Sequence, residues 1–138
     1  MNTRIGYAYV VADVIHIGHI RNLENSKGMC DKLIVGVLTD KATMEKKPRP
    51  VMSFEERFEI ISSLKCVDCV VTQDTYSPIP NVKNLRPNIL FESASHSPEA
   101  IKEAGETMKL LGGRLIVVPY FSQHSSTNIK KRIRNGQS

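Results

Sequence analysis

Residues 9–27, YVVADVIHIGHIRNLENSK, begin as an apolar run and end as a polar, helix-like segment. The change falls at His16-Ile17-Gly18-His19, which holds two of the four histidines in the chain. An apolar strand that leads directly into an amphipathic helix is typical of parallel sheets, whose strands are joined by crossover helices. The stretch therefore predicts a parallel sheet whose first strand ends at two histidines.

The rest of the chain repeats this alternation of strand and helix. Runs rich in Val and Ile, nearly continuous as in strands buried on both faces, occupy residues 4–11, 32–38, 67–71, 88–92 and 114–120. Helical patterns occupy residues 18–29, 53–65, 97–113 and 125–133. Ser53 and Glu56 form a capping-box signature, and Gly112-Gly113 is a typical helix stop. We predict an α/β fold: one Rossmann-like, doubly wound, five-stranded parallel sheet with helices on both faces.

Length and composition set the class of protein. The 138 residues, 41% of them hydrophobic, predict one domain over 1–138 with a frayed tail at 135–138. No apolar run approaches the roughly 20 residues that span a bilayer, and the first residues lead into a strand pattern, so we expect a cytoplasmic protein without membrane contact. Three cysteines argue for a reducing compartment, and we interpret Cys66 and Cys69 as structural residues.

The charge of the chain favours an anionic ligand. The chain has 19 Lys and Arg residues and 14 Asp and Glu residues, and the resulting net charge of +5 suits a nucleotide ligand. Aromatic residues are few and tryptophan is absent, so we do not expect a nucleic-acid surface.

His16 and His19 are the candidates for chemistry. Ligands of doubly wound sheets bind beyond the carboxyl ends of the strands, where a helix N-terminus favours anions. Three-residue spacing puts both imidazoles on one helical face, and Gly18 allows a ligand to approach the backbone. The pair suits phosphate binding in phosphoryl or nucleotidyl transfer. Two alternatives remain: histidines without chemistry, and a metal site formed by Asp13, His16 and His19.

The sequence resembles the HxGH nucleotidyltransferases of the cytidylyltransferase type from about residue 4 to residue 133. The resemblance rests on ADVIHIGHIRNLENSK, DKLIVGVLTDKA, KKPRPVMSFEERFEIISSLKCVDCVV and SSTNIKKRI, in that order. Within the group the chain is similar to glycerol-3-phosphate cytidylyltransferases. It is still more similar to the domains that accompany phosphoenolpyruvate mutase in phosphonate biosynthesis. The heptose-phosphate adenylyltransferases are close cousins.

This resemblance implies a reaction. A phosphate or phosphonate oxygen of a small acceptor attacks the α-phosphorus of CTP, whose triphosphate carries Mg²⁺, and pyrophosphate leaves without a covalent enzyme intermediate. It implies no dedicated protein site for the metal, small-molecule substrates as partners, and a homodimer.

The resemblance also implies roles for individual residues. His16 and His19 would stabilise charge at the α-phosphate and the leaving pyrophosphate, and Lys46 would bridge the acceptor and the triphosphate, with Lys47 and Arg49 as auxiliaries. Arg57 would hold the outer phosphates, although a solvated arginine paired with Glu55 or Glu56 is the alternative. The residues expected at the nucleotide are Val10, Val11, Ala12, Asp13, Gly18, Ser125, Ser126 and Thr127. Asp40 is equally well explained as a turn former.

Three segments depart from the family pattern. Residues 10–13 replace Gly-Thr-Phe-Asp, and residues 91–96 replace a Gly-Asp-Asp-Trp type segment, so the expected acidic and aromatic groups are missing and His96 is a candidate substitute. Residues 120–124 replace Arg-Thr-Glu-Gly-Ile, which makes Tyr120 and His124 candidates for acceptor contacts. We interpret these changes as altered specificity. The alternatives are a nucleotide-binding protein without transferase activity and an adenylyltransferase that uses ATP on a sugar phosphate.

Overall fold

The computed structural model describes residues 3–119 of the chain, and these contain one parallel sheet. Its strands are β1 (Ile5–Val10), β2 (Lys32–Leu38), β3 (Cys69–Gln73), β4 (Ile89–Ser93) and β5 (Arg114–Val118). They lie in the order β3-β2-β1-β4-β5, and every neighbouring pair is parallel. The prediction of a five-stranded parallel sheet is confirmed.

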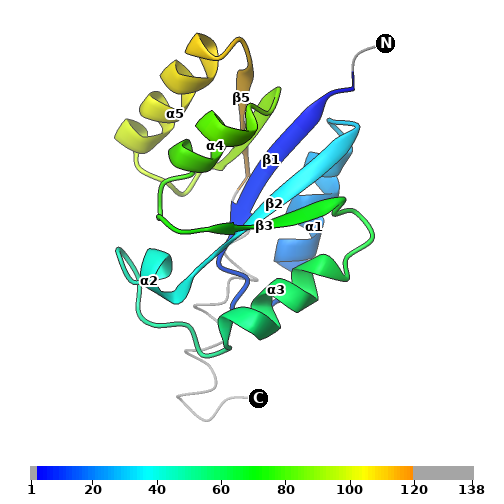
Figure 1. Cartoon of the computed structure of the whole chain (residues 1–138), viewed down its shortest axis with the longest axis vertical. Coiled ribbons are helices and arrows are strands. Elements are labelled where there is room, and N and C mark those ends of the chain that lie inside the picture. Colours follow the sequence, from blue (N-terminus) through cyan, green and yellow to red (C-terminus); the bar gives the residue numbers. More distant parts are fainter. Residues whose placement is uncertain (1–2, 120–138) are drawn as a thin grey trace.

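Helices cover both faces of this sheet. Helices α1 (Ile17–Lys27) and α3 (Phe54–Ser62) lie on one face, and α4 (Ile79–Leu85) and α5 (Pro98–Leu110) lie on the other (Figure 1). Each face has its own core: Leu23 and Ile61 pack in the first, whereas Tyr7 packs with Val82 and Met108 in the second. The doubly wound arrangement is therefore confirmed as well.

Two helix ends follow their sequence signals. The Ser53 hydroxyl accepts a hydrogen bond from the backbone N–H of Glu56 at 3.2 Å, which begins α3. Helix α5 ends at Leu110, and Gly112 follows with a φ of 78°, a left-handed conformation that glycine adopts without a steric cost.

Two helices were not expected from the sequence. The short helix α2 (Asp40–Thr43) follows β2, capped by the Thr39 hydroxyl. Helix α4 begins at the prolines 78 and 80, has no side-chain cap, and ends at Arg86 with a φ of 49°. Prolines of this density are typical of loops, which is why the pattern concealed a helix. The predicted helix over 125–133 lies outside the described residues.

The strand order reverses between β1 and β4. From β1 the chain proceeds outward to β2 and β3, then crosses to the other side of β1 through α4 and returns as β4. The crevice at such a switch point opens at the carboxyl ends of the strands, where ligands bind in open α/β sheets. The loops after β1 and β4 therefore border the expected site.

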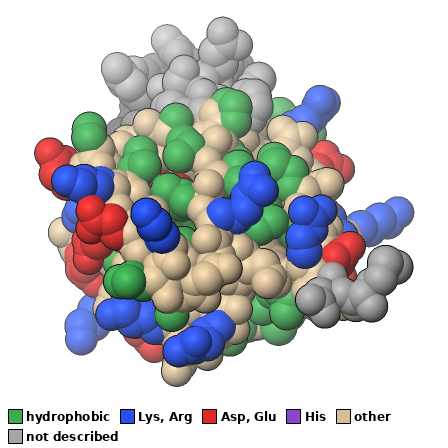
Figure 2. Space-filling model, turned by 90° about the horizontal axis from the view of Figure 1, so that it is seen from above, with side chains coloured by type: hydrophobic (Ala, Val, Ile, Leu, Met, Phe, Trp, Pro, Cys, Tyr) green, Lys and Arg blue, Asp and Glu red, His purple; other side chains and the backbone are tan. Residues whose placement is uncertain are grey.

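On the face shown in Figure 2, lysine and arginine side chains are scattered among hydrophobic and acidic ones and form no continuous basic patch.

Among the helices of residues 3–119, none combines the length and the apolar character that crossing a bilayer would require.

Candidate active site

A cavity of about 420 Å³ lies at this switch point. Its lining comes from the ends of β1 and β4, the start of α1 and the segment between α2 and α3. The lining includes nine of the predicted site residues: Val10, Val11, Asp13, His16, Gly18, His19, Lys47, Arg49 and His96. The structure thus gathers residues that are up to 86 positions apart in the sequence, from Val10 to His96.

Three predicted residues do not line the cavity. Ala12 and Arg57 are fully buried, and Lys46 is exposed outside the cavity lining. The expected contact of Ala12 with a nucleotide stays a prediction. The predicted residues Tyr120, His124, Ser125, Ser126 and Thr127 lie outside the described residues.

The two histidines are fixed by the first turn of α1. Nδ1 of His16 accepts a hydrogen bond from the backbone N–H of Gly18 at 3.0 Å, and Nδ1 of His19 accepts one from the backbone N–H of His16 at 3.2 Å. The pair thereby forms a capping box built from imidazoles. Because both Nδ1 atoms accept, the proton of each neutral ring is on Nε2. Each neutral histidine therefore carries an N–H donor at Nε2, which suits phosphate oxygens.

The electrostatics keep His19 neutral. Burial is the largest cause, and His16 and Lys47 add to it, so the pKa of His19 falls to about 4; Asp13 acts in the opposite direction. At neutral pH this imidazole is a hydrogen-bond donor and not a cation.

The basic segment is fastened to the end of β1 by Asp13. Oδ2 of this buried carboxylate accepts from the backbone N–H of Val51, and Oδ1 accepts from that of Met52, both at 2.9 Å. The segment that carries Lys47 and Arg49 is thereby tied to the end of β1, and both side chains line the cavity together with the start of α1. In the described geometry Asp13 positions the basic loop, and its predicted contact with a nucleotide stays a prediction.

The turn that carries Asp13 is strained. Ala12 and Val14 have φ values of 62° and 52°, in the left-handed region that residues other than glycine rarely occupy and that is least favourable for a β-branched residue such as valine. Strain of this kind gathers at functional sites, where the surrounding contacts hold it in place. The turn between β1 and α1 is thus shaped by its contacts more than by its own preferences.

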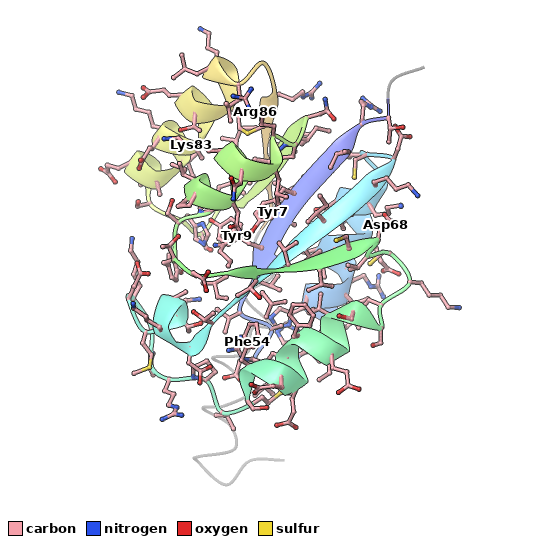
Figure 3. The ribbon with its side chains drawn as sticks, viewed as in Figure 1. Tyr7, Tyr9, Phe54, Asp68, Lys83 and Arg86 are labelled. Atoms are coloured by element: carbon pink, nitrogen blue, oxygen red, sulfur yellow. The ribbon has the colours of Figure 1, made fainter. Side chains whose placement is uncertain are left out.

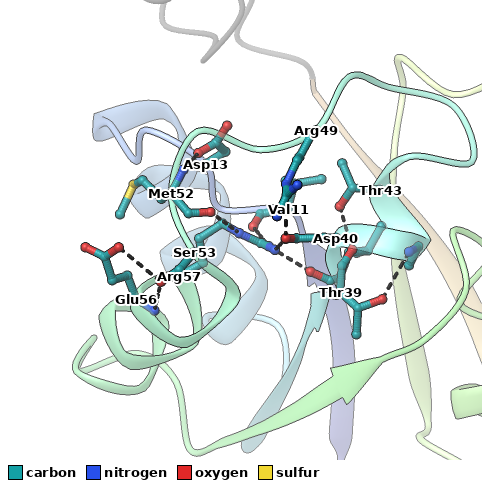
Figure 4. A network of polar contacts seen from close by, with 12 residues as sticks. Val11, Asp13, Thr39, Asp40, Thr43, Arg49, Met52, Ser53, Glu56 and Arg57 are labelled. Atoms are coloured by element: carbon teal, nitrogen blue, oxygen red, sulfur yellow. Dashed lines mark hydrogen bonds and ion pairs between the residues drawn. The ribbon is translucent and has the colours of Figure 1, made fainter.

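Arg57 is a buried connector in this structure. Its guanidinium donates to the carbonyls of Val11 and Leu38 at 2.6 and 2.7 Å and to Oδ1 of Asp40 at 2.7 Å, and Nε donates to the Met52 carbonyl at 3.3 Å (Figure 4). The alternative of a solvated helix arginine paired with Glu55 or Glu56 is wrong, because the side chain is fully buried and pairs with Asp40. Contact with outer phosphates stays a prediction; the observed contacts tie β1, β2 and α3 together below the cavity.

The metal alternative at Asp13, His16 and His19 is not supported. Both oxygens of Asp13 and both Nδ1 atoms of the histidines accept backbone hydrogen bonds. Within residues 3–119, no group of three or more His, Cys, Asp or Glu side chains is arranged to hold a metal ion. Cys66 and Cys69 are free thiols, and Cys69 is the first residue of β3.

A second polar group at the cavity was not predicted from the sequence. The Tyr9 hydroxyl donates to Oε1 of Glu92 at 2.5 Å and lies 3.0 Å from Nδ1 of His96, which also contacts Oε1. Tyr7 and Tyr9 leave β1 on the side of α4 and α5 (Figure 3). Segment 91–96 therefore does contain an acidic group, the carboxylate of Glu92. The available signal was Glu92 itself, a charged residue in the otherwise apolar run NILFE.

Fold and site together define a doubly wound α/β protein with a cavity at its switch point, the place where proteins of this architecture bind their ligands. The Cytidylyltransferase-like family model matches residues 9–132, and the chain belongs to this family.

Its relatives include longer proteins. The bifunctional protein HldE of Hyphomonas neptunium is 32% identical over 136 residues, which cover 97% of this chain and 28% of that protein. The HldE protein of Geotalea uraniireducens is 32% identical over 126 residues, which cover 90% of this chain and 26% of that protein. This chain therefore spans about a quarter of the length of these relatives. Together with the family match, they support membership of the nucleotidyltransferase superfamily.

Solved structures agree on the fold. The lipopolysaccharide core biosynthesis protein from Thermoplasma volcanium matches with a TM-score of 0.74 and 26% identity, over 87% of this chain and 98% of that one. A pantoate-beta-alanine ligase from Francisella tularensis matches with a TM-score of 0.65 over 94% of this chain and 65% of its own. At 16% identity, this second likeness concerns the fold alone.

Proposed function

We propose that this nucleotidyltransferase moves CMP from CTP to a phosphate or phosphonate oxygen of a small acceptor and releases pyrophosphate. The observation that carries the proposal is the pair of histidines at the start of α1, each with Nδ1 engaged by a backbone N–H and therefore with Nε2–H as its donor. They share their cavity with Lys47 and Arg49.

In the proposed reaction, the acceptor oxygen forms a bond to the α-phosphorus as the bond to pyrophosphate breaks. His16 and His19 donate hydrogen bonds to oxygens whose negative charge grows in the transition state, and fixed donors of this kind lower the barrier most. Because His19 is neutral, its role is donation, without a proton transfer of its own. Lys46, Lys47 and Arg49 bind the anionic groups of the two substrates.

Mg²⁺ fits this arrangement as part of the nucleotide. Both oxygens of Asp13 already accept backbone hydrogen bonds, and Glu92 lies on the sheet face opposite the histidines. The other charged side chains that line the cavity, Lys47 and Arg49, are cationic. The ion would neutralise charge on the triphosphate. We also propose a homodimer, as the family resemblance implies.

A second donor and acceptor are favoured by the relatives. The HldE proteins and the lipopolysaccharide core biosynthesis protein are nearer in sequence to this chain than the ligase is. Together with the resemblance to heptose-phosphate adenylyltransferases, this favours ATP and a sugar phosphate as the competing substrate pair.

Pyrophosphate release in the presence of Mg²⁺ tests both proposals. CTP and ATP are each paired with 2-hydroxyethylphosphonate, 2-aminoethylphosphonate, glycerol 3-phosphate and a heptose 1-phosphate. Release with CTP and one of the first three supports the cytidylyltransferase, and release with ATP and the heptose phosphate supports the second candidate. Silence with every pair, alongside calorimetric binding of CTP, would identify a nucleotide-binding protein without transferase activity.

A further inference from the structure

Glu92 is a buried carboxylate at the cavity that the proposed chemistry leaves unused. It belongs to β4, is 1% exposed, and lies on the sheet face covered by α4 and α5, whereas the two histidines come from α1 on the other face. The hydrogen bonds that Glu92 makes to other described residues all involve one of its oxygens. Oε1 accepts from the Tyr9 hydroxyl at 2.5 Å and the Ser93 backbone N–H at 3.2 Å, and it contacts Nδ1 of His96.

These contacts determine which hydrogen-bonding groups Glu92 and His96 can offer a ligand. A carboxylate can only accept, so Nδ1 of His96 carries the proton and, in the neutral ring, Nε2 is an acceptor. Within residues 3–119, neither Oε2 of Glu92 nor Nε2 of His96 receives a hydrogen bond. Both residues line the cavity. This side of the cavity therefore presents acceptors, whereas His16 and His19 present donors.

Tyr76 links this side to the basic segment. Its ring centroid lies 6.1 Å from that of His96, and Nζ of Lys46 lies 5.3 Å from the same Tyr76 ring. A small molecule whose anionic group binds at Lys46 would extend across Tyr76 toward Glu92. Such a molecule needs hydrogen-bond donors at the end away from its phosphorus, because a buried carboxylate oxygen left without a donor is costly.

We propose that Glu92 and His96 form the specificity subsite for the acceptor, and that they bind a hydroxyl or ammonium group on its carbon skeleton. This inference rests on the proposed function, since it takes the acceptor phosphate to lie at Lys46. It assigns the acceptor to polyol or sugar phosphates, or to amino or hydroxyalkyl phosphonates, and excludes simple alkyl phosphates and phosphonates.

Matched acceptors test the subsite. Glycerol 3-phosphate is compared with propyl phosphate, and 2-hydroxyethyl- and 2-aminoethylphosphonate are compared with ethylphosphonate. The readouts are the calorimetric Kd of each acceptor and, separately, pyrophosphate release. We expect the wild-type protein to bind one donor-bearing acceptor at least about 100-fold more tightly than its alkyl partner, because sites built to bind a polar group reject analogues that lack it. The acceptor that binds most tightly shows whether the subsite prefers a hydroxyl or an ammonium group.

The Glu92→Gln variant makes the test specific. Because three groups hold Oε1, the amide oxygen takes that place, and the NH₂ replaces Oε2 with a donor. In this variant the preference for the donor-bearing acceptor over its alkyl partner should fall below about tenfold, and the Kd of the alkyl acceptor should change little. Glu103→Gln, at an exposed site on α5, is the matched control. If Glu92→Gln fails to fold, His96→Phe, at a partly exposed position, removes the Nε2 acceptor and should also weaken the preference.

The outcomes separate the two proposals. Equal wild-type affinity for both members of every pair, or an equal loss with both members in Glu92→Gln and in His96→Phe, overturns the subsite. Absence of pyrophosphate release with every acceptor overturns the transferase, while the binding comparison still decides the subsite.

Discussion

The backbone N–H of His16 donates to Nδ1 of His19 over 3.2 Å, so the two histidines at the cavity are joined through the first turn of α1. His16 is at the same time the N-cap of this helix, because its own Nδ1 accepts from Gly18. A substitution of His16 therefore affects helix stability and chemistry together, and the two effects can be separated.

His16→Ser separates them. Serine is a good N-cap, so the free energy of unfolding should stay within about 0.5 kcal/mol of wild type, whereas His16→Ala should lose about 1 kcal/mol. Both variants lose the Nε2–H donor, and we expect kcat to fall by roughly 100-fold or more in each. Urea unfolding and pyrophosphate release measure the two quantities. Full turnover in His16→Ser would show that the imidazole serves only as a cap.

His19 should make folding dependent on pH. Its folded-state pKa of about 4 lies below the value near 6.5 expected in the unfolded chain. Between these values the unfolded chain binds the proton and the folded protein does not, so stability falls as the pH decreases from 6.5 to 4, by up to roughly 3 kcal/mol. His19→Gln should lose this part of the dependence. Urea midpoints between pH 7 and pH 4.5 test it, and identical slopes for the two proteins would contradict it.

The sheet was predictable because its strands are buried on both faces. Continuous apolar runs such as KLIVGVL are typical of strands that lie between two layers of helices, and the capping residue Ser53 and the stop at Gly112 mark helix ends directly. Helix α4 was not predictable because its proline-flanked start gives no local helix signal, and its stability comes from packing Val82 against Tyr7.

The site was predictable only in part. His16 and His19 are neighbours in the sequence, so a motif reveals them. Arg57 was expected at the phosphates, but its four acceptors come from three separate segments that no local pattern connects. Glu92 was missed for a similar reason: its partner Tyr9 is 83 positions away, and only the parallel pairing of β1 with β4 brings them together.

A substitution of Arg57 should lower the stability of the fold, because its contacts in the structure are all with other parts of the protein. Arg57→Lys retains the charge, but an ammonium cannot reach acceptors that are spread around a planar guanidinium. We expect a loss of about 3 kcal/mol in the free energy of unfolding, because the variant leaves Asp40 and two strand-end carbonyls poorly paired. Urea unfolding gives the value. Unchanged stability together with lost turnover would instead indicate direct contact with substrate.

Lys47 connects the basic segment to the histidines. It lines the cavity, and its charge is one of the causes that lower the pKa of His19. Lys47→Ala should therefore raise the KM for the nucleotide by roughly tenfold, through loss of a phosphate contact, and should also raise the pKa of His19. Stability at pH 7 should change little, because the side chain is exposed.

The pKa change makes this prediction independent of turnover. NMR titration of the His19 ring reports it in the absence of any substrate, and Lys83→Ala, an exposed lysine on α4, is the matched control. Since burial is the largest cause of the low pKa, the value in Lys47→Ala should rise yet stay below 6.5. A titration curve identical to wild type would place the Lys47 charge too far from the imidazole to act on it, and the same distance would argue against both groups binding one triphosphate.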